Sequence, residues 1–185
     1  CLWKIPENLS FEEATLMDPA ANGYNAVVQQ GNLKSGEIVV VFGVGALGLM
    51  SIAQASIAGA SKIIAVGMKA DRKRREKIAR KYGADEFFAS DEEENIVEKV
   101  KEAAREDGVA LVVDAAGVPA LTSAAIQIVR SEGSIVRIGM SNKTYEDSLD
   151  GFSLKNIRFS GHMGYNQESW RNTLALAKAE KLNLK

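Results

Sequence analysis

The sequence predicts an α/β fold, a doubly wound parallel sheet of about six strands with helices on both faces. Strand-like and helix-like segments alternate along most of the 185-residue chain, which is typical of a parallel sheet with helical crossovers. The first strand-like segment, Ile38–Phe42, is apolar at every position, as expected for a strand that is covered on both faces. A glycine-rich turn and a helix-like segment follow it directly, as in the first βα unit of such folds.

The chain before this strand is expected to be helical. Ser10 and Glu13 have the spacing of a capping box, in which the serine caps a helix and the glutamate bonds back to it. Pro19 and Gly23 are expected to interrupt this helical stretch, which then resumes over residues 26–30.

The later elements follow in alternation. Predicted strands cover 62–66, 86–89, 109–114, 133–139 and 157–161, and predicted helices cover 47–58, 71–82, 92–104, 119–129 and 169–179. Gly83 ends the helix over 71–82, and Pro119 stands in the first turn of its helix, where proline is favoured. The segment 141–152 is the one long stretch for which no regular structure is expected.

The composition excludes several functional classes. Lysine and arginine number 23 against 24 aspartates and glutamates, so the charge balance favours neither a nucleic acid nor a membrane surface as a partner. No apolar run approaches the roughly 20 residues of a membrane helix. Cys1 is the single cysteine, so no internal disulfide forms, which is consistent with a cytoplasmic protein.

Both ends of the sequence indicate a longer parent protein. The chain begins with Cys1 rather than methionine, and it ends in a lysine-rich stretch from Lys178 to Lys185. We therefore expect a fragment, and the alternative is simple processing of the N-terminus.

The turn between the first strand and its helix has the spacing of a dinucleotide-binding site. Gly43 permits the tight turn, Gly45 lets the backbone approach a pyrophosphate, and Gly48 lets the helix pack against the strand. The pyrophosphate is expected at the helix N-terminus, where free N–H groups and the helix dipole favour an anion. A Rossmann-type NAD(P) site is expected, against the alternative of a turn built for packing only; its residues are Gly43, Val44, Gly45, Ala46, Leu47 and Gly48.

The end of the second strand distinguishes NADP from NAD. NAD-binding domains usually carry an acid there for the ribose hydroxyls, whereas this chain has Gly67-Met68-Lys69. Lys69 and Arg72 supply positive charge for a 2′-phosphate, so NADP is favoured. Two alternatives stay open: the basic side chains form a solvated helix face, or Asp71 binds the ribose diol of NAD.

Two other enzyme classes share the strand–turn–helix pattern. Methyltransferases that use S-adenosylmethionine also normally place an acid after the second strand, and they remain an alternative. Short-chain dehydrogenases need a Tyr-x-x-x-Lys pair. The fourth residue after the four tyrosines is Val28, Glu86, Leu149 and Ser169, so this catalytic pair is absent.

A collinear series of segments runs through nearly the whole chain. It includes Ile5-Pro6-Glu7-Asn8-Leu9-Ser10, Leu16-Met17-Asp18-Pro19, the turn 43–48, Tyr82-Gly83-Ala84-Asp85, Val113-Asp114-Ala115-Ala116-Gly117 and Gly133-Ser134-Ile135-Val136-Arg137-Ile138-Gly139. This series resembles the medium-chain, zinc-containing alcohol dehydrogenase-like family, especially its polyol and threonine dehydrogenase branch.

The resemblance implies one half of a two-domain oxidoreductase. Residues 1–34 would be a lead-in with the active-site helix, and 35–185 the NAD(P)-binding domain. A GroES-like catalytic domain, absent from this chain, would supply most zinc ligands and much of the pocket for an alcohol or polyol, and zinc would act as a Lewis acid before hydride transfer. The fragment alone is expected to be inactive. A zinc-free medium-chain reductase and a non-catalytic dinucleotide-binding module are the alternatives.

The resemblance also implies roles for individual residues. Asp18 holds the position of a zinc ligand or its neighbour, the alternative being a turn residue before Pro19; His162 and Cys1 are the other soft candidates. Asp18 alone cannot hold catalytic zinc, which needs about three protein ligands. Asn22 departs from the threonine that many relatives have near the nicotinamide.

The cofactor cleft and an oligomer interface complete the expectations. Ligands of such sheets bind beyond the carboxyl ends of the strands, and in relatives the sixth strands of two subunits pair. The strand from Ile157 to Gly161 is therefore the candidate interface of a homodimer or tetramer, against an ordinary edge strand. The cleft residues, besides the turn, are Gly67, Met68, Lys69, Arg72, Ala115, Ala116, Gly117, Ile138, Gly139 and Met140.

Overall fold

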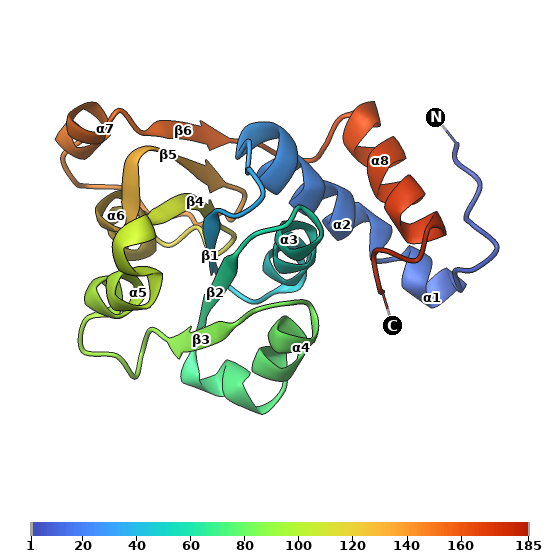
Figure 1. The fold of residues 1–185 in the computed structure, drawn as a ribbon, viewed down its shortest axis with the longest axis horizontal. Coiled ribbons are helices and arrows are strands. Elements are labelled where there is room, and N and C mark those ends of the chain that lie inside the picture. Colours follow the sequence, from blue (N-terminus) through green and yellow to red (C-terminus); the bar gives the residue numbers. More distant parts are fainter. Residues whose placement is uncertain (1, 185) are drawn as a thin grey trace.

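The computed structural model describes residues 2–184, apart from the side chain of Glu106. Within this range the strands form one six-stranded parallel sheet with the order β3-β2-β1-β4-β5-β6, which confirms the predicted fold class (Figure 1). The strands are β1 (Ile38–Phe42), β2 (Lys62–Gly67), β3 (Glu86–Ala89), β4 (Val109–Asp114), β5 (Val129–Arg137) and β6 (Arg158–Gly161).

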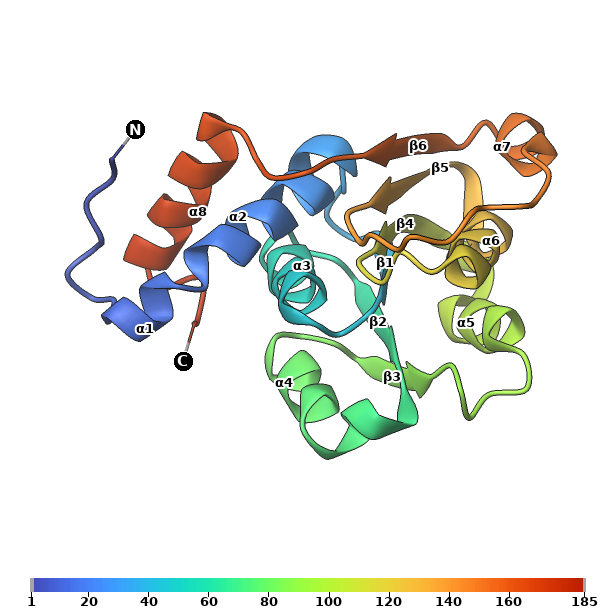
Figure 2. The same cartoon turned by 180° about the vertical axis from the view of Figure 1, so that it is seen from behind.

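Helices cover both faces of this sheet (Figure 2). One buried cluster joins the sheet to α3 and α4, and a second joins its other face to α5 and α6. The helices are α1 (Phe11–Ala14), α2 (Met17–Tyr24), the π-helical turn η1 (Asn25–Gln30), α3 (Ala46–Ile57), the 3-10 turn η2 (Lys69–Lys73), α4 (Arg75–Lys81), α5 (Ile96–Ala104), the 3-10 turn η3 (Arg105–Asp107), α6 (Pro119–Ile128), α7 (Asp150–Lys155) and α8 (Gln167–Lys178).

The apolar first strand lies at the centre of the core. Val39 and Val41 face one buried cluster, while Val40 and Phe42 face the other. Successive side chains of a strand point to opposite faces, so a strand covered on both sides must be apolar throughout. Each such side chain contributes about 1.5–3 kcal/mol when fully buried.

The N-terminal helices differ from the sequence-based expectation. The capping box at Ser10 is present, since its hydroxyl accepts from the N–H of Glu13 at 3.1 Å and its own N–H donates to the Glu13 carboxylate at 2.7 Å. Pro19 and Gly23, however, do not interrupt α2. Pro19 lies in the first turn, where a backbone N–H has no partner within the helix.

Gly23 is the last residue but one of α2, and this helix packs closely against α3 there. A Cβ at Gly23 would lie 2.8 Å from the carbonyl carbon of Met50 and 2.9 Å from the N–H nitrogen of Ser51. No side chain fits at that distance from another backbone. The glycine that suggested a break is therefore a packing residue.

We expect Gly23→Ala to destabilise the fold, since the added methyl must push α2 away from α3. Overpacking of this kind typically costs about 1–3 kcal/mol. Urea unfolding followed by circular dichroism measures the effect, with Ala175→Gly on α8 as a helical control of similar size. An unchanged unfolding midpoint for Gly23→Ala would contradict the close helix contact.

Other element boundaries also differ. The helix expected over 71–82 is divided at Arg74, whose φ of −131° and ψ of −55° separate η2 from α4. The helix expected from residue 92 begins at Ile96, because the Asn95 side chain accepts from the N–H groups of Val97 and Glu98 and caps it. The segment 141–152 leads into α7, which was not expected.

Candidate functional site

The turn after β1 leaves the N-terminus of α3 open. Gly43 has a φ of +88°, a conformation that favours glycine, and its N–H donates to the carbonyl of Val66 at 2.8 Å. Gly45 is the N-cap of α3, and no described side chain caps this helix. The first N–H groups of a helix have no partners within it and attract anions. The turn therefore presents free N–H groups at the carboxyl end of the central strand.

The glycines of this turn have different surroundings. A Cβ on Gly48 would overlap the carbonyl oxygen of Gly43, so packing alone requires that glycine. A Cβ on Gly45 would meet no described atom within 4 Å. Packing of the described chain therefore does not explain Gly45. An open space in front of Gly45 fits a ligand that approaches the backbone.

The loops after β4 and β5 adjoin this turn. A Cβ on Gly43 would lie 3.1 Å from the nitrogen of Ala116, and one on Gly117 would lie 2.5 Å from the carbonyl carbon of Gly139. The three turns therefore meet at the carboxyl edge of β1, β4 and β5. The structure brings together, among the predicted site residues, Gly43, Val44, Gly45, Ala46, Leu47, Gly48, Ala115, Ala116, Gly117, Ile138 and Gly139. Met140 follows them and is largely exposed.

Asp114 holds the loop after β4. Its side chain is completely buried, and one carboxylate oxygen accepts from the N–H groups of Ala116 at 3.1 Å and Gly117 at 2.7 Å. The other accepts from the hydroxyl of Thr122 at 3.0 Å. A buried carboxylate is stable only when it is bonded in this way. Asp114 thus fixes the backbone of the turn after β4.

Arg137 and Ser141 complete this edge, and neither was predicted as a site residue from the sequence. The guanidinium of Arg137 donates to the carbonyl of Gly117 at 2.8 Å, and the Ser141 hydroxyl donates to the same oxygen at 2.6 Å. An arginine directly after the buried run Gly133–Val136 of β5 is the signal that marks such a residue.

Two of the basic side chains that follow β2 have an acidic partner. Lys69 and Arg72 both pair with the Glu92 carboxylate, at 3.4 Å and 2.6 Å. The hydrogen bond from Arg72 lowers the pKa of Glu92, and the same bond raises the pKa of Arg72. Arg72 also lies over the ring of Phe87, 5.5 Å from its centre. Both basic side chains therefore have an acidic partner in this structure, and their proposed role toward a 2′-phosphate stays a prediction.

Asp71 lies at the same place and turns back toward the strand. Its Oδ2 accepts from the N–H of Met68 at 2.9 Å, and its Oδ1 pairs with Arg75 at 3.0 Å. The side chain is only 13% exposed. An acid is therefore held at the end of β2, although no acid belongs to the strand itself.

Asp18 lies in the first turn of α2 and is exposed. The side-chain amide of Asn22 donates to its carbonyl at 3.0 Å and to its Oδ2 at 3.4 Å. Burial, and then a hydrogen bond with Asp18, raise the pKa of Tyr165. Among residues 2–184, no three His, Cys, Asp or Glu side chains lie close enough to hold a metal ion. Cys1, the other candidate, lies outside the described residues.

His162 follows β6 and is partly buried. Neither ring nitrogen has a hydrogen-bond partner among the described residues, and burial lowers the pKa of the imidazole. Its backbone N–H donates to the carbonyl of Arg137 at 3.2 Å. The backbone of His162 therefore lies beside the end of β5, and burial of the ring disfavours its protonated form.

This burial predicts a pH dependence of stability. The folded chain disfavours the protonated ring, so the pKa of His162 is lower in the folded chain than in the unfolded chain. The contribution of the neutral ring to stability is therefore complete above the unfolded pKa of about 6.5, and it decreases as the pH falls toward the lower folded pKa. Between pH 7 and pH 5, we expect the free energy of unfolding to decrease less for His162→Phe than for the unsubstituted chain. Chemical unfolding at several pH values tests this prediction. An equal dependence of the free energy of unfolding on pH in both proteins would contradict it.

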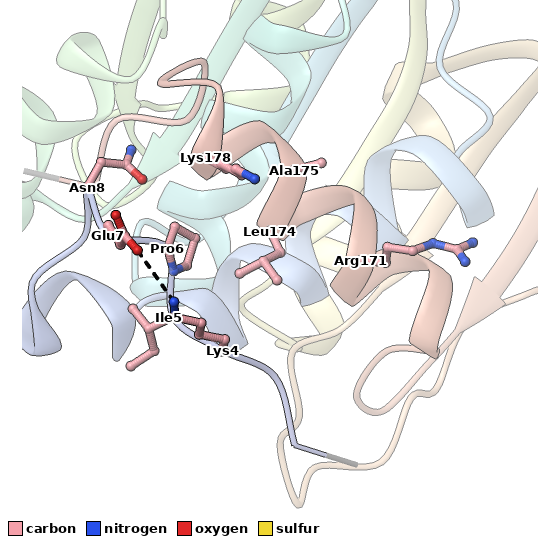
Figure 3. A pocket seen from close by; sticks show the side chains of 9 residues that line it. All are labelled: Lys4, Ile5, Pro6, Glu7, Asn8, Arg171, Leu174, Ala175 and Lys178. Carbon is pink, nitrogen blue, oxygen red and sulfur yellow. Dashed lines mark hydrogen bonds and ion pairs between the residues drawn. The ribbon is translucent and has the colours of Figure 1, made fainter.

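A separate hollow of about 630 Å³ lies between the N-terminal segment and α8 (Figure 3). Lys4 and Glu7, both on the N-terminal segment, pair at 3.4 Å, and Leu174 of α8 also lines the hollow. None of the turn residues 43–48 lines it. It has neither the open helix N-terminus nor the converging strand ends of the site above, so we do not assign the cofactor to it.

Comparisons with known proteins show the family of this chain. Residues 46–179 match the family described as zinc-binding dehydrogenase. The chain is 33% identical over its whole length to the uncharacterized zinc-type alcohol dehydrogenase-like protein YdjL of Escherichia coli, and covers 51% of that protein. It is 31% identical over 99% of its length to a probable D-xylulose reductase A of Aspergillus clavatus, again covering 51%.

Solved structures also include alcohol dehydrogenases that are similar to this chain. The alcohol dehydrogenase TADH of Thermus sp. ATN1 superposes with a TM-score of 0.88 at 30% identity, over 98% of this chain and 51% of that one. The chain thus spans about half the length of the relatives that it matches.

Proposed function

The chain belongs to the zinc-binding dehydrogenase family, and from this premise we propose that it is the NAD(P)-binding half of an alcohol or polyol dehydrogenase. Residues 35–185 would be the cofactor domain and 1–34 the lead-in with the active-site helix. A GroES-like catalytic domain would lie outside this chain. The observation that carries the proposal is Gly45, which faces open space at the uncapped N-terminus of α3.

The residues present fit a dinucleotide. The free N–H groups at the start of α3 would hold the pyrophosphate, because they combine unpaired donors with the positive end of the helix dipole. The backbone around Gly117 and Gly139 would line the nicotinamide side of the cleft, since ligands of such sheets lie beyond the carboxyl ends of the strands. The bound nicotinamide would supply the hydride chemistry. The chain itself orients the cofactor.

Asp18 is proposed as one donor of a zinc site that is completed outside this chain. Support comes from its place in α2 and from Asn22 and Tyr165, which contact its carboxylate. A ligating carboxylate is usually held by such hydrogen bonds. Zinc would act as a Lewis acid on the alcohol oxygen, and the chain alone would be inactive.

The exposed edge of the sheet is proposed as the interface of a homodimer or tetramer. β6 is the last strand of the sheet, and Phe159 on it is 44% exposed. An edge strand offers unpaired N–H and C=O groups to a second copy. Sedimentation of the chain at several concentrations tests this assignment.

We also propose a small alcohol or polyol as substrate and the cytoplasm as location. The xylulose reductase relative supports the first, and the single cysteine supports the second. No helix in residues 2–184 has the length and apolar character needed to cross a membrane.

The cofactor remains a choice between NADP and NAD. The basic side chains of Lys69 and Arg72 are the reason to favour NADP, and their pairing with Glu92 weakens it. The preference for NADP or NAD therefore depends on which side chain contacts the adenosine ribose at the end of β2.

The experiment that tests the proposed function uses the longer protein that contains this chain. We expect it to reduce NAD or NADP when given alcohols or polyols, and to lose this activity on zinc removal. Asp18→Ala should lower its zinc content, measured by metal analysis, with Glu12→Ala as the control. Activity that survives complete zinc removal would contradict the metal assignment, and tighter binding of S-adenosylmethionine than of either nucleotide would contradict the proposal as a whole.

A further inference from the structure

The exposed methionines of this chain lie at one edge of the sheet. Met68 follows β2, Met140 follows β5 and Met163 follows β6, and these parallel strands all end at the same edge. The other two of the five methionines, Met17 and Met50, are buried in one cluster. We propose that Met140 and Met163 are sites of reversible oxidation to methionine sulfoxide by peroxides, and that this modification weakens cofactor binding. This inference rests on the proposed function, because it assumes that a dinucleotide binds at this edge.

Exposure separates the methionines into two groups. Met163 is 89% exposed and Met140 is 79% exposed, whereas Met17 and Met50 are each 2% exposed. Methionine is among the side chains that are most often buried. Oxidation of a methionine depends on the access of the oxidant to its sulfur. The two methionines that follow the neighbouring strands β5 and β6 are therefore the most accessible to a peroxide in the solvent.

The backbone of Met140 packs against the turn after β4. A Cβ on Gly117 would lie 2.6 Å from the nitrogen of Met140. The hydroxyl of Ser141, the next residue, donates to the carbonyl of Gly117 at 2.6 Å. These contacts fix the backbone on both sides of the methionine, so its exposed side chain stays at the edge where the nicotinamide is proposed to bind.

The loop after β6 holds Met163 in a similar way. The N–H of His162, just before it, donates to the carbonyl of Arg137 at 3.2 Å. The carbonyl of Gly164, just after it, accepts from the side-chain amide of Asn25 at 3.4 Å. The side chain of Met163 therefore projects from a backbone that is bonded to β5 on one side and to η1 on the other.

Met68 provides an internal comparison at the same edge. It is 50% exposed, and its sulfur accepts a hydrogen bond from the hydroxyl of Ser90 at 3.6 Å. Oxidation uses a lone pair of the sulfur, and this hydrogen bond occupies one. We therefore expect Met68 to react with peroxide more slowly than Met140 and Met163.

The reaction needs only a peroxide as the oxidant. The thioether sulfur gives an electron pair to one peroxide oxygen, the O–O bond breaks, and hydrogen peroxide leaves as water. The sulfur is oxidised to a sulfoxide, and methionine sulfoxide reductases reverse the step. A peroxide is much smaller than a dinucleotide, so an edge that opens for cofactor exchange also admits the oxidant.

The modification changes the polarity of the cofactor edge. A sulfoxide converts an apolar side chain into a polar one, and its oxygen binds water. A nicotinamide that binds beside this oxygen removes the water without offering a matched donor. We expect at least about a fivefold loss of affinity, which corresponds to the cost of one polar group that loses its hydrogen-bond partner.

The first measurement is the order of oxidation in the longer protein that contains this chain. Hydrogen peroxide is added for increasing times, a thiol reductant then reverses disulfides and sulfenic acids, and peptides are analysed by mass spectrometry. We expect sulfoxide first at Met140 and Met163, later at Met68, and last at Met17 and Met50. Oxidation of Met17 or Met50 before the two exposed methionines would overturn the inference.

The second measurement is the affinity for NADH or NADPH, whichever binds more tightly, before and after peroxide. The unsubstituted protein should lose affinity at least about fivefold, and treatment with methionine sulfoxide reductases for both epimers should restore it. The double variant Met140→Leu/Met163→Leu should have the same affinity before and after peroxide, because leucine is apolar and does not react. Met68→Leu is the matched control and should stay sensitive to peroxide.

The outcomes distinguish this inference from the proposed function. Normal cofactor binding that peroxide does not change would overturn the inference alone. An equal loss of affinity in the double variant and in the unsubstituted protein would also overturn it, because the sensitive group would then lie elsewhere. Untreated protein that binds neither cofactor would contradict the proposed function, and with it the effect of oxidation on binding.

Discussion

Gly45→Val is expected to weaken the binding of nicotinamide cofactors by at least about 100-fold, or about 2.7 kcal/mol, while the chain stays folded. The backbone of Gly45 has a φ of −74° and a ψ of −173°, which any residue adopts. The space in front of it holds no described atom. A valine there therefore costs the fold little but fills the space through which a pyrophosphate would approach α3.

Gly48→Ala is the matched control, because it changes the other face of the same turn. Its methyl would overlap the carbonyl oxygen of Gly43, so we expect a loss of several kcal/mol of stability, beyond ordinary overpacking. Thermal unfolding and cofactor titration of both variants give the comparison. If Gly45→Val bound cofactor normally, or unfolded as easily as Gly48→Ala, the proposed role of the open space would be wrong.

Asp114→Ala is expected to destabilise the chain by about 3 kcal/mol or more. The substitution leaves the N–H groups of Ala116 and Gly117 without their acceptor, and each buried unpaired donor costs about 1–3 kcal/mol. Urea unfolding at pH 7 measures the loss. The loop after β4 also loses its anchor, so cofactor affinity should decrease in the fraction that remains folded.

Thr122→Val is the control with which the loss of stability in Asp114→Ala is compared. It removes one of the three bonds to Asp114 and keeps the shape of the side chain, so a loss of about 1 kcal/mol is expected. A loss for Asp114→Ala no larger than that for Thr122→Val would contradict the view that the carboxylate organises the loop.

The sequence predicts the sheet well because burial on two faces leaves a simple pattern. Ile38–Phe42 and Val109–Asp114 are strands as expected, and both are buried throughout. Prediction fails where a tertiary contact overrides a local preference. Gly23 suggests a helix break in isolation, but the approach of α3 requires a glycine within a continuous helix.

The candidate site also has a part that local sequence patterns predict and a part that depends on tertiary contacts. The glycine turn and the strand ends follow from local spacing, so the sequence places them together. The arrangement at the end of β2 does not follow from local spacing, because the partner of Lys69 and Arg72 is Glu92, which lies 20 residues beyond Arg72. Nor does sequence spacing show that Asp71 turns back onto Gly67, since a continuous helix over 71–82 would carry it away from the strand.

Amide chemical shifts of the isotopically labelled chain, recorded as NADH is added, test the central claim most directly. We predict saturable shifts that are largest for Gly45, Ala46 and Leu47, with a second group at Ala116 and Gly117. We also predict that Gly45→Val abolishes them while the rest of the spectrum keeps its dispersion. Saturable shifts confined to the hollow beside α8, or the absence of any shift at the turn, would contradict the assignment of this chain as a dinucleotide-binding domain.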